Sequence, residues 1–432
     1  MTLPASNLKI SFHERLLAAT LFMVIVWPSY IKVKIPGLPG LSLDRVFLVL
    51  LLLVLLLGLQ NLLSKKKTTI HFHSLLLSFL VLWALLITLF SPVQLKSFYS
   101  TMNWFLMGPL FFYYFSIFNH KKLNSERVVG YIFLSLNFTA FIGLIEYFNK
   151  GPLFDSYLIS VDKFNEDIGI VNIRDGVIRI KSVFAHPLIF AQFLLLNIFL
   201  TYHYLNECKN NYKKTILVLI LIASYFLMLQ TDSRVGLFIA VVMPIFYFYF
   251  RLFSHKKTGV LIKALTTILI VFLAIFATQK APELLDLARQ SHSLNMQGQI
   301  EAKELSSLAR ITQLDLGSKA FIESPLYGYG LGQALYNIPQ LRALDNYYLT
   351  LLLEIGAPGL FLFLSVIFLV MKKSIKNIRY KYDPFVLTII TSISAILCFY
   401  LIISIPKINP ILFVFLAILM TKTKKASRNE QE

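Results

Sequence analysis

Long apolar segments separated by short polar ones run along the whole sequence. Val46–Leu59 and Phe361–Met371 contain no charged residue. About 20 apolar residues are needed for a helix to cross the hydrocarbon core of a bilayer. On that criterion the pattern predicts an all-α, polytopic membrane protein with about 12 transmembrane helices, and residues 1–432 form a single integral membrane domain. The predicted spans are 16–33, 43–63, 71–90, 98–118, 128–148, 182–204, 215–231, 235–253, 260–279, 347–370, 384–404 and 408–421.

Composition excludes a chain of soluble domains. Hydrophobic residues make up 57% of the chain and charged residues 15%, with a mean hydropathy of +0.69. Soluble domains carry about 25% charged residues. The first apolar stretch lacks a small-residue cleavage site, so it is expected to remain as a span. Cys208 and Cys398 are not expected to form a disulfide, and no Cys/His cluster has the spacing of metal ligands.

The net charge of +19 follows an alternating pattern. Every second loop is basic, and these loops with the tail hold about half of the 41 Lys and Arg. Basic loops are cytoplasmic by the positive-inside rule, so both termini are predicted to be cytoplasmic, and the basic residues are expected to contact membrane lipids rather than nucleic acid. The basic residues are Lys65–Lys67, then Lys121, Lys122 and Arg127, then Lys209, Lys213 and Lys214, then Arg251, Lys256 and Lys257, then Lys372, Lys373, Lys376, Arg379 and Lys381, and finally Lys422, Lys424, Lys425 and Arg428.

Two loops on the opposite, outer side are long, at about 149–181 and 280–346. The second contains a stripe with a period of 3.6 residues, which is typical of an amphipathic helix. We expect that helix to lie on the membrane face or to cap the bundle, and the working site to be on the outer side. The stripe is Leu305, Leu308, Ala309, Thr312, Leu316 and Ala320.

Positive charge on the outer side departs from the orientation rule. Arg234 lies in Thr231–Gly236, a tight break between two spans. Charged residues at membrane depth are costly and usually functional, although Arg234 could also be an arginine that reaches the interface and pairs with Asp232.

Arg310 lies on the predicted outer helix, where a solvated charge would be ordinary. Arg174, Arg179 and Lys181 add positive charge in the other long outer loop. The arginine side chain binds phosphate through two parallel hydrogen bonds and stays charged. A basic cluster beside a bilayer therefore favours a lipid-linked phosphate or diphosphate.

His186 and a glycine-rich segment also lie on the outer side. His186 precedes Pro187 at a span start, where it could be a helix cap or a polar anchor. Gly328, Gly330 and Gly332 resemble a phosphate-binding loop, but no strand precedes them. We expect a turn that approaches a substrate closely.

Carboxylates near the outer side could act chemically or structurally. Asp345, followed by Asn346, precedes the tenth span and could be an N-cap or a general base. Glu354 within that span and Glu146 in the fifth each need a partner, for which an outer arginine is expected. Outside the tail, the chain has no acidic pair separated by one residue to hold a metal–nucleotide-sugar, so a metal-independent reaction without cofactors is expected.

In order along residues 179–360, these motifs resemble the O-antigen ligase and polymerase superfamily of bacterial membrane proteins. The motifs are Arg179 with His186-Pro187, Thr231-x-Ser233-Arg234-x-Gly236, Arg310, Pro325-Leu326-x-Gly328-x-Gly330, Asp345-Asn346-x-Tyr348-Leu349 and Glu354-x-Gly356-x-x-Gly359.

The resemblance implies an inverting, metal-independent glycosyltransferase at the periplasmic face of the bacterial inner membrane. Its donor would be an undecaprenyl-diphosphate-linked oligosaccharide, and the family's diphosphate-binding arginines correspond to Arg234 and Arg310. We expect Arg179 and His186 to assist them, with Asn346, Glu354, Gly328 and Gly330 in supporting positions. A chain-length regulator and a flippase would be further partners.

The sequence departs from the family at one position. Many members, ligases especially, have His-Asn where this chain has Asp345-Asn346. An aspartate could accept the same proton or orient the acceptor hydroxyl. This difference favours a polymerase that joins lipid-linked repeat units. The alternatives are a ligase that transfers glycan to lipid A–core or to protein, and a lipid-linked sugar flippase.

Overall fold

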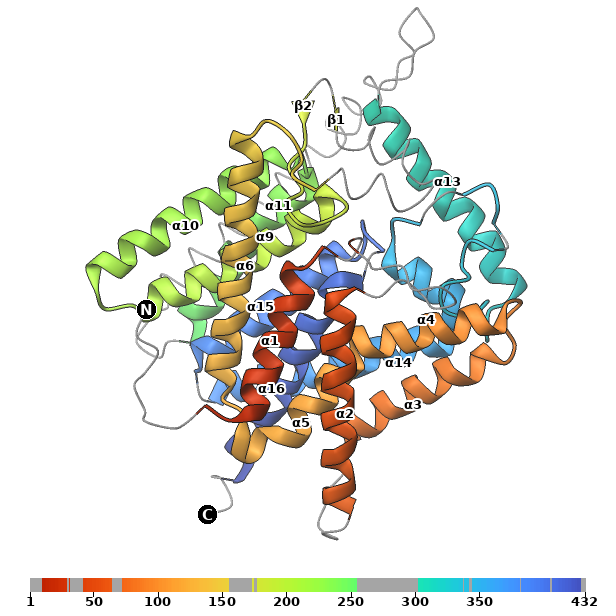
Figure 1. Ribbon diagram of the computed structural model, residues 1–432, viewed down its shortest axis with the longest axis horizontal. Coiled ribbons are helices and arrows are strands. Elements are labelled where there is room, and N and C mark those ends of the chain that lie inside the picture. Colours follow the sequence, from red (N-terminus) through yellow and green to blue (C-terminus); the bar gives the residue numbers. More distant parts are fainter. Residues whose placement is uncertain are drawn as a thin grey trace, which may run out of the picture.

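A computed structural model of the chain describes residues 10–28, 31, 42–63, 72–154, 173–174, 177–254, 302–336, 338–341, 344–380, 382–404 and 406–428. The predicted span 260–279 lies outside these residues. The elements are α1 (Phe12–Val26), α2 (Leu43–Leu63), α3 (Phe72–Thr88), α4 (Gln94–Met107), α5 (Pro109–Lys122), α6 (Ser125–Phe148), β1 (Ile173–Arg174), β2 (Val177–Ile178), α9 (Pro187–Glu207), α10 (Asn211–Gln230), α11 (Arg234–Ser254), α13 (Ala302–Glu323), α14 (Tyr347–Tyr380), α15 (Pro384–Phe399), the 3-10 helix η1 (Pro406–Ile408) and α16 (Asn409–Arg428) (Figure 1).

The described residues are almost entirely helical, as predicted. One departure from an all-α fold is a short ribbon in the first of the long predicted outer loops, in which β1 and β2 pair antiparallel. Five of the described helices are long and apolar enough to span a membrane: Leu43–Gln60, Ser125–Phe148, Pro187–Glu207, Asn211–Gln230 and Tyr347–Ile378. Shorter apolar helices are Phe72–Thr88, Val235–Ile245, Pro384–Phe399 and Asn409–Lys422. The chain is thus a multi-pass membrane protein, and the count of about 12 spans is not confirmed.

The centre of the helix assembly is α16, which corresponds to the shortest predicted span. Every residue from Ile408 to Met420 is buried, because α16 packs against α5, α14 and α15. By contrast, α2 and α10 expose large apolar side chains, for example Leu57 and Leu219. Such faces are favourable in contact with lipid, where no hydrophobic penalty applies.

The predicted span 98–118 is two helices rather than one. α4 ends at Met107 and α5 begins at Pro109, and Gly108 between them has φ −142° and ψ −86°. A Cβ on Gly108 would lie 2.7 Å from the ring of Phe413 on α16. The close approach of α16 therefore accounts for glycine at this break, and Pro109 fits the first turn of the next helix because that position needs no N–H donor.

α14 is also interrupted, one third of the way along. Gly356 has φ 68° and ψ 178°, outside the helical region, and Pro358 follows it. A Cβ on Gly356 would collide with the carbonyl oxygen of Leu326. The interruption lets an outer loop reach the backbone of a membrane helix.

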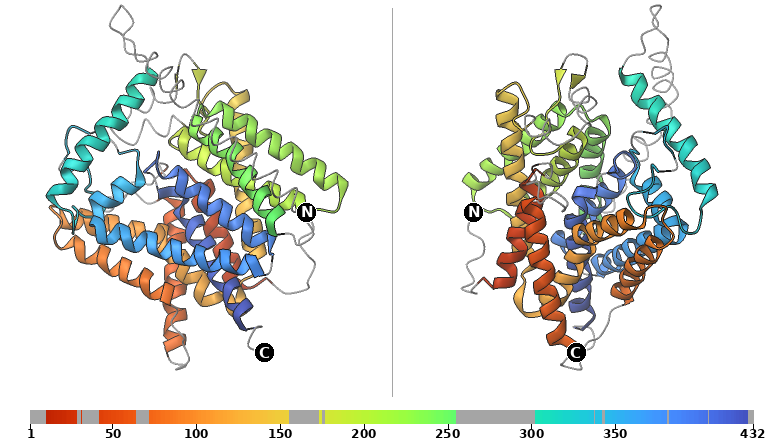
Figure 2. Two further views of the ribbon diagram at one scale, coloured as in Figure 1. Left: turned by 180° about the vertical axis from the view of Figure 1, so that it is seen from behind. Right: turned by 45° about the vertical axis from the view of Figure 1, so that its right-hand side comes forward.

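α13 is the predicted amphipathic helix of the second long loop. Figure 2 shows it at the edge of the molecule, where it packs on α14. Gln313, Gly317 and Ala320 form its buried side, whereas Thr312 is exposed. The buried side of α13 therefore differs from the predicted stripe at Thr312, because Gln313 faces the start of α14.

Candidate active site

The segment between β2 and α9 is fixed to neighbouring helices by hydrogen bonds. Arg179 donates from Nε to the carbonyl oxygen of Thr231 at 2.9 Å, and the amide of Ile180 donates to Gln230. Both acceptors lie at the carboxyl end of α10, which carries partial negative charge. Arg179 is 8% exposed, so the residue expected to bind diphosphate also holds this loop against α10.

Glu146, which is fully buried on α6, holds the next part of the segment. Its carboxylate accepts hydrogen bonds from the backbone amides of Lys181 and Ser182. Ser182 has φ 53° and donates from its hydroxyl to the carbonyl of Thr139 at 2.7 Å. These backbone amides are partners of Glu146 that the sequence did not predict.

His186 is the N-cap of α9, which confirms the helix-cap interpretation. Its Nδ1 accepts from the amide of Leu188 at 3.1 Å, and Pro187 occupies the first helical position. In the neutral ring, the proton therefore lies on Nε2, which is free of this interaction. Burial lowers the pKa of His186 to about 3, and the positive charges of Arg179, Lys181 and Arg310 act in the same direction.

The electrostatic effect of Arg310 on His186 connects two distant parts of the chain. Arg310 lies on α13, and His186 lies at the start of α9. Arg179 and Lys181 act on the same ring. Positive charges from both long predicted outer loops therefore lower the pKa of His186.

Arg234 is the first residue of α11, and its surroundings show how the motif Thr231–Gly236 folds. The side chain of Arg234 itself lies outside the described part of the structure, as does that of Arg174. Asp232 takes up a left-handed conformation with φ 47°. Ser233 then caps α11, accepting from the amide of Gly236 at 3.1 Å. The motif is thus a three-residue reversal between α10 and α11.

Gly236 completes this reversal for a steric reason. A Cβ there would lie 2.8 Å from the hydroxyl of Ser233 and 3.0 Å from the sulfur of Met228. Glycine is therefore required if Ser233 is to cap the helix while α10 and α11 stay close. The backbone consequently fixes Arg234 at the amino end of α11, where partial positive charge favours an anion.

Arg310 and Asp345 are connected through Gln313. The backbone amide of Asp345 donates to Oε1 of Gln313 at 3.0 Å, and Nε2 of Gln313 donates to the Asp345 carboxylate at 3.5 Å. Gln313 lies three residues after Arg310 on the same face of α13. Among the described residues, the buried Nε of Arg310 has no hydrogen-bond partner.

Asn346, rather than Asp345, caps α14. Its side chain accepts from the amide of Leu349 at 3.1 Å, and α14 begins at the next residue, Tyr347. The N-cap interpretation of Asp345 is therefore wrong. Asp345 is half-buried, and its carboxylate accepts from Gln313 rather than from an amide at the start of α14.

The glycine-rich segment packs on the interrupted helix α14. Its three glycines have positive φ, which confirms a tight turn, and the close approach is to protein backbone. The amides of Tyr329 and Gly330 donate to the carbonyls of Leu353 and Glu354 at 2.8 and 2.9 Å, and the amide of Ala357 donates to Pro325 at 2.9 Å. A Cβ on Gly328 would lie 2.6 Å from the carbonyl oxygen of Leu353.

Glu354 holds the end of this segment. Its carboxylate accepts from the amide of Gly332 at 2.9 Å, and the residue is 9% exposed. The expectation that Glu354 pairs with an outer arginine is therefore corrected to an interaction with backbone. Together, Glu354, Gly328 and Gly330 fix the loop that follows α13.

Sequence reasoning missed Gln313 and Lys407. Nothing in the sequence distinguishes Gln313 from other polar residues on α13. Lys407 did carry a signal, because it is a single basic residue on the predicted outer side, as Arg234 is. It is 6% exposed, donates to the carbonyl of Trp27 at 2.8 Å and lies 5.1 Å from the ring centre of Phe184, two residues before His186.

The comparisons with known proteins agree with this region of the structure. The family described as "O-Antigen ligase" matches residues 217–364, which include Arg234, Arg310 and Asp345 but not Arg179 or His186. A curated protein of Salmonella muenchen, "O-antigen polymerase", is 24% identical over 210 residues, 47% of this chain. The match spans half of that relative's length. The middle of the chain is therefore similar to the O-antigen ligase family, and the resemblance of the chain to the O-antigen ligase and polymerase superfamily is confirmed.

Proposed function

We propose that this chain is a polymerase of O-antigen or another surface polysaccharide. It would transfer a glycan from undecaprenyl diphosphate to a hydroxyl of a second lipid-linked repeat unit. The reaction would take place at the periplasmic face of the bacterial inner membrane. The similarity to an O-antigen polymerase supports the reaction class, and the basic residues of the predicted inner loops support the orientation.

The connection between α13 and Asp345 is the observation that carries this proposal. Gln313, one helical turn after Arg310, is hydrogen-bonded to Asp345 at 3.0 Å, and the positive charges of Arg179, Lys181 and Arg310 lower the pKa of His186. Arg310 has a buried guanidinium nitrogen without a hydrogen-bond partner in the described residues. A lipid diphosphate would supply the missing acceptor.

In this proposal the donor's diphosphate binds to Arg234 and Arg310, with Arg179 and the Nε2–H of His186 as further donors. Arginine forms strong, charge-assisted hydrogen bonds with phosphate oxygens. Negative charge grows on the diphosphate as its bond to the sugar breaks, so these donors stabilise the transition state more than the bound substrate. A donor held on Arg310 would lie within reach of the groups that Gln313 positions.

Asp345 would serve the acceptor. The acceptor oxygen attacks the anomeric carbon as the bond between that carbon and the phosphate oxygen breaks. Undecaprenyl diphosphate leaves with the bonding electrons, and the hydroxyl proton passes to the Asp345 carboxylate. A single displacement inverts the anomeric centre. Asn346 would position Asp345 by capping the start of α14. Glu354 would hold the glycine-rich loop against the same helix.

A ligase is the second candidate, because the matched family is described as "O-Antigen ligase". The two functions differ in the acceptor, which is a lipid-linked repeat unit for a polymerase and lipid A–core for a ligase. Deletion of the gene in its host and electrophoresis of the lipopolysaccharide separate them. A polymerase mutant retains core that carries a single repeat unit, whereas a ligase mutant carries none and accumulates lipid-linked chains.

Single variants then test the site. Arg310→Ala should abolish long chains with normal protein abundance, because loss of one such donor typically lowers turnover by about 100- to 1,000-fold. Lys319→Ala is the matched control, since Lys319 lies on α13 and pairs with exposed Asp315. Full chain length in Arg310→Ala would refute the diphosphate role of Arg310. Movement of lipid-linked sugar across proteoliposomes without new glycosidic bonds would indicate a flippase instead.

A further inference from the structure

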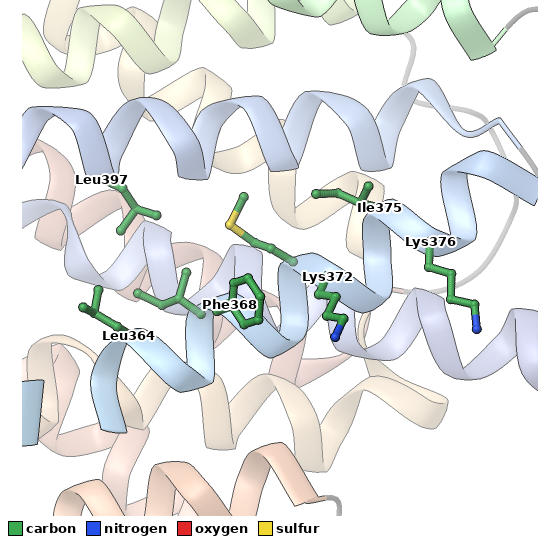
Figure 3. Close-up of a pocket in the computed structure, with 8 residues that line it drawn as sticks. Leu364, Phe368, Lys372, Ile375, Lys376 and Leu397 are labelled. Atoms are coloured by element: carbon green, nitrogen blue, oxygen red, sulfur yellow. The ribbon is translucent and has the colours of Figure 1, made fainter. Parts of the chain in front are cut away.

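A groove between α14 and α15 lies away from the candidate active site. It encloses about 930 Å³. Six apolar side chains and two lysines line it: Leu364, Ile367, Phe368, Met371, Ile375 and Leu397 with Lys372 and Lys376. In Figure 3, Leu364 and Leu397 lie at one end of the groove and Lys376 at the other. The cavity is therefore apolar along its length and cationic toward one end.

The two lysines are free to bind an anion. They are four residues apart, so they project from the same side of α14, and both are exposed. Within the described residues, neither forms an ion pair. The ammonium of Lys372 lies 5.9 Å from the ring centre of Phe368, which directs it along the groove, and Phe368 is itself 62% exposed.

The length of the groove fits one leaflet of a bilayer. Leu364 and Lys376 are twelve residues apart, or about 18 Å at the rise of an α-helix. Half of the hydrocarbon core is about 15 Å thick. An acyl chain whose head group lies at the lysines would therefore extend along the groove to about the middle of the membrane.

We propose that this groove binds one anionic phospholipid of the inner leaflet. Its phosphate would lie on Lys372 and Lys376, and one acyl chain would cover the apolar lining. By the predicted orientation, these lysines are cytoplasmic, where anionic lipids attract basic residues. The site is independent of the proposed reaction, because Lys376 lies 20 residues beyond the interruption at Gly356, about 30 Å along the helix.

The competing occupants are the polyprenyl carrier and a second copy of the chain. The carrier's diphosphate would be bound at the outer end of α14, so its charge would lie far from these lysines. A second copy would need an acidic group to complement them. The phospholipid alone combines an inner-leaflet phosphate with a chain of the right length.

Native mass spectrometry of the purified full-length protein tests this site. The probes are phosphatidylglycerol and phosphatidylcholine with identical acyl chains. We expect the protein to retain one phosphatidylglycerol in preference to phosphatidylcholine. The double variant Lys372→Gln/Lys376→Gln should weaken this preference by about 30-fold, the product of roughly fivefold for each lysine at an anionic surface.

Lys373→Gln is the matched control, because its side chain projects from a different side of α14. It should leave the preference unchanged. Leu397→Trp, which fills the apolar end, should reduce retention of both lipids. The proposal would be overturned by an effect of Lys373→Gln equal to that of the double variant. Retention of undecaprenyl phosphate in place of phosphatidylglycerol would also overturn it, as would a dimer that the double variant dissociates.

Discussion

Gln313→Ala tests the connection between the outer helix and the proposed base. Gln313 is 8% exposed and accepts from the backbone amide of Asp345 at 3.0 Å. Removal of an acceptor from a buried amide costs about 1–3 kcal/mol, and Asp345 would move to recover a partner. This cost applies to the conformation in which Asp345 is placed for proton transfer. The rate of chain elongation should therefore drop by about 5- to 150-fold, since 1.36 kcal/mol equals a factor of ten in rate.

The assay is the initial rate of glycosidic bond formation in proteoliposomes with a lipid-linked repeat unit. Ser318→Ala is the control, because Ser318 is an exposed residue of α13 that donates to the carbonyl of Asp315. Gln313→Glu keeps the acceptor but adds a carboxylate beside Asp345, so the acid limb of its pH–rate profile should move to higher pH. Equal rates for Gln313→Ala and Ser318→Ala, with an unmoved profile for Gln313→Glu, would show that Asp345 does not depend on Gln313.

Two further predictions concern stability. Gly356→Ala places a Cβ against the carbonyl oxygen of Leu326, at a residue with φ 68°. Left-handed strain and overpacking together should lower the free energy of unfolding by about 2–5 kcal/mol. An unchanged thermal midpoint in detergent would contradict this prediction. His186 has its pKa lowered to about 3 by burial, so below pH 6.5 the unfolded chain gains a proton that the folded chain does not, and stability should fall by up to about 1.4 kcal/mol per pH unit. His186→Asn can still cap α9, and it should reduce the fall of the thermal midpoint between pH 7 and pH 5. An equal fall in the variant and in the unmodified protein would show that another group titrates.

Apolar length predicted the helices well, but it could not predict where they break. The predicted span 43–63 has the same bounds as α2, and residues 128–148 lie within α6. The breaks at Gly108 and Gly356 arise from residues far away in the chain, Phe413 and Leu326 respectively. The apolarity of a segment does not show which distant residues contact it, so a single span was expected at 98–118.

For the candidate site, residue type and side of the membrane indicated which residues to consider but not their partners. Positive charge on the predicted outer side grouped Arg310 with Arg179, and both lower the pKa of His186. The carboxylates Glu146 and Glu354 were expected to meet arginines, and both accept hydrogen bonds from backbone amides that the sequence did not predict. Backbone amides are present at every position except proline, so the sequence cannot show which of them a buried carboxylate will bind.

The central place of α16 has a consequence for how the protein is made. α16 follows every other described helix in the chain, yet it fills the space between α5, α14 and α15. During synthesis, α5, α14 and α15 are inserted into the membrane before α16. Their surfaces that later contact α16 stay uncovered, or are bound by an insertion factor, until α16 leaves the ribosome. A premature stop codon shortly before Asn409 would therefore remove the centre of the bundle, and cellular proteases should degrade the product even though most of the spans and all of the proposed site residues are present.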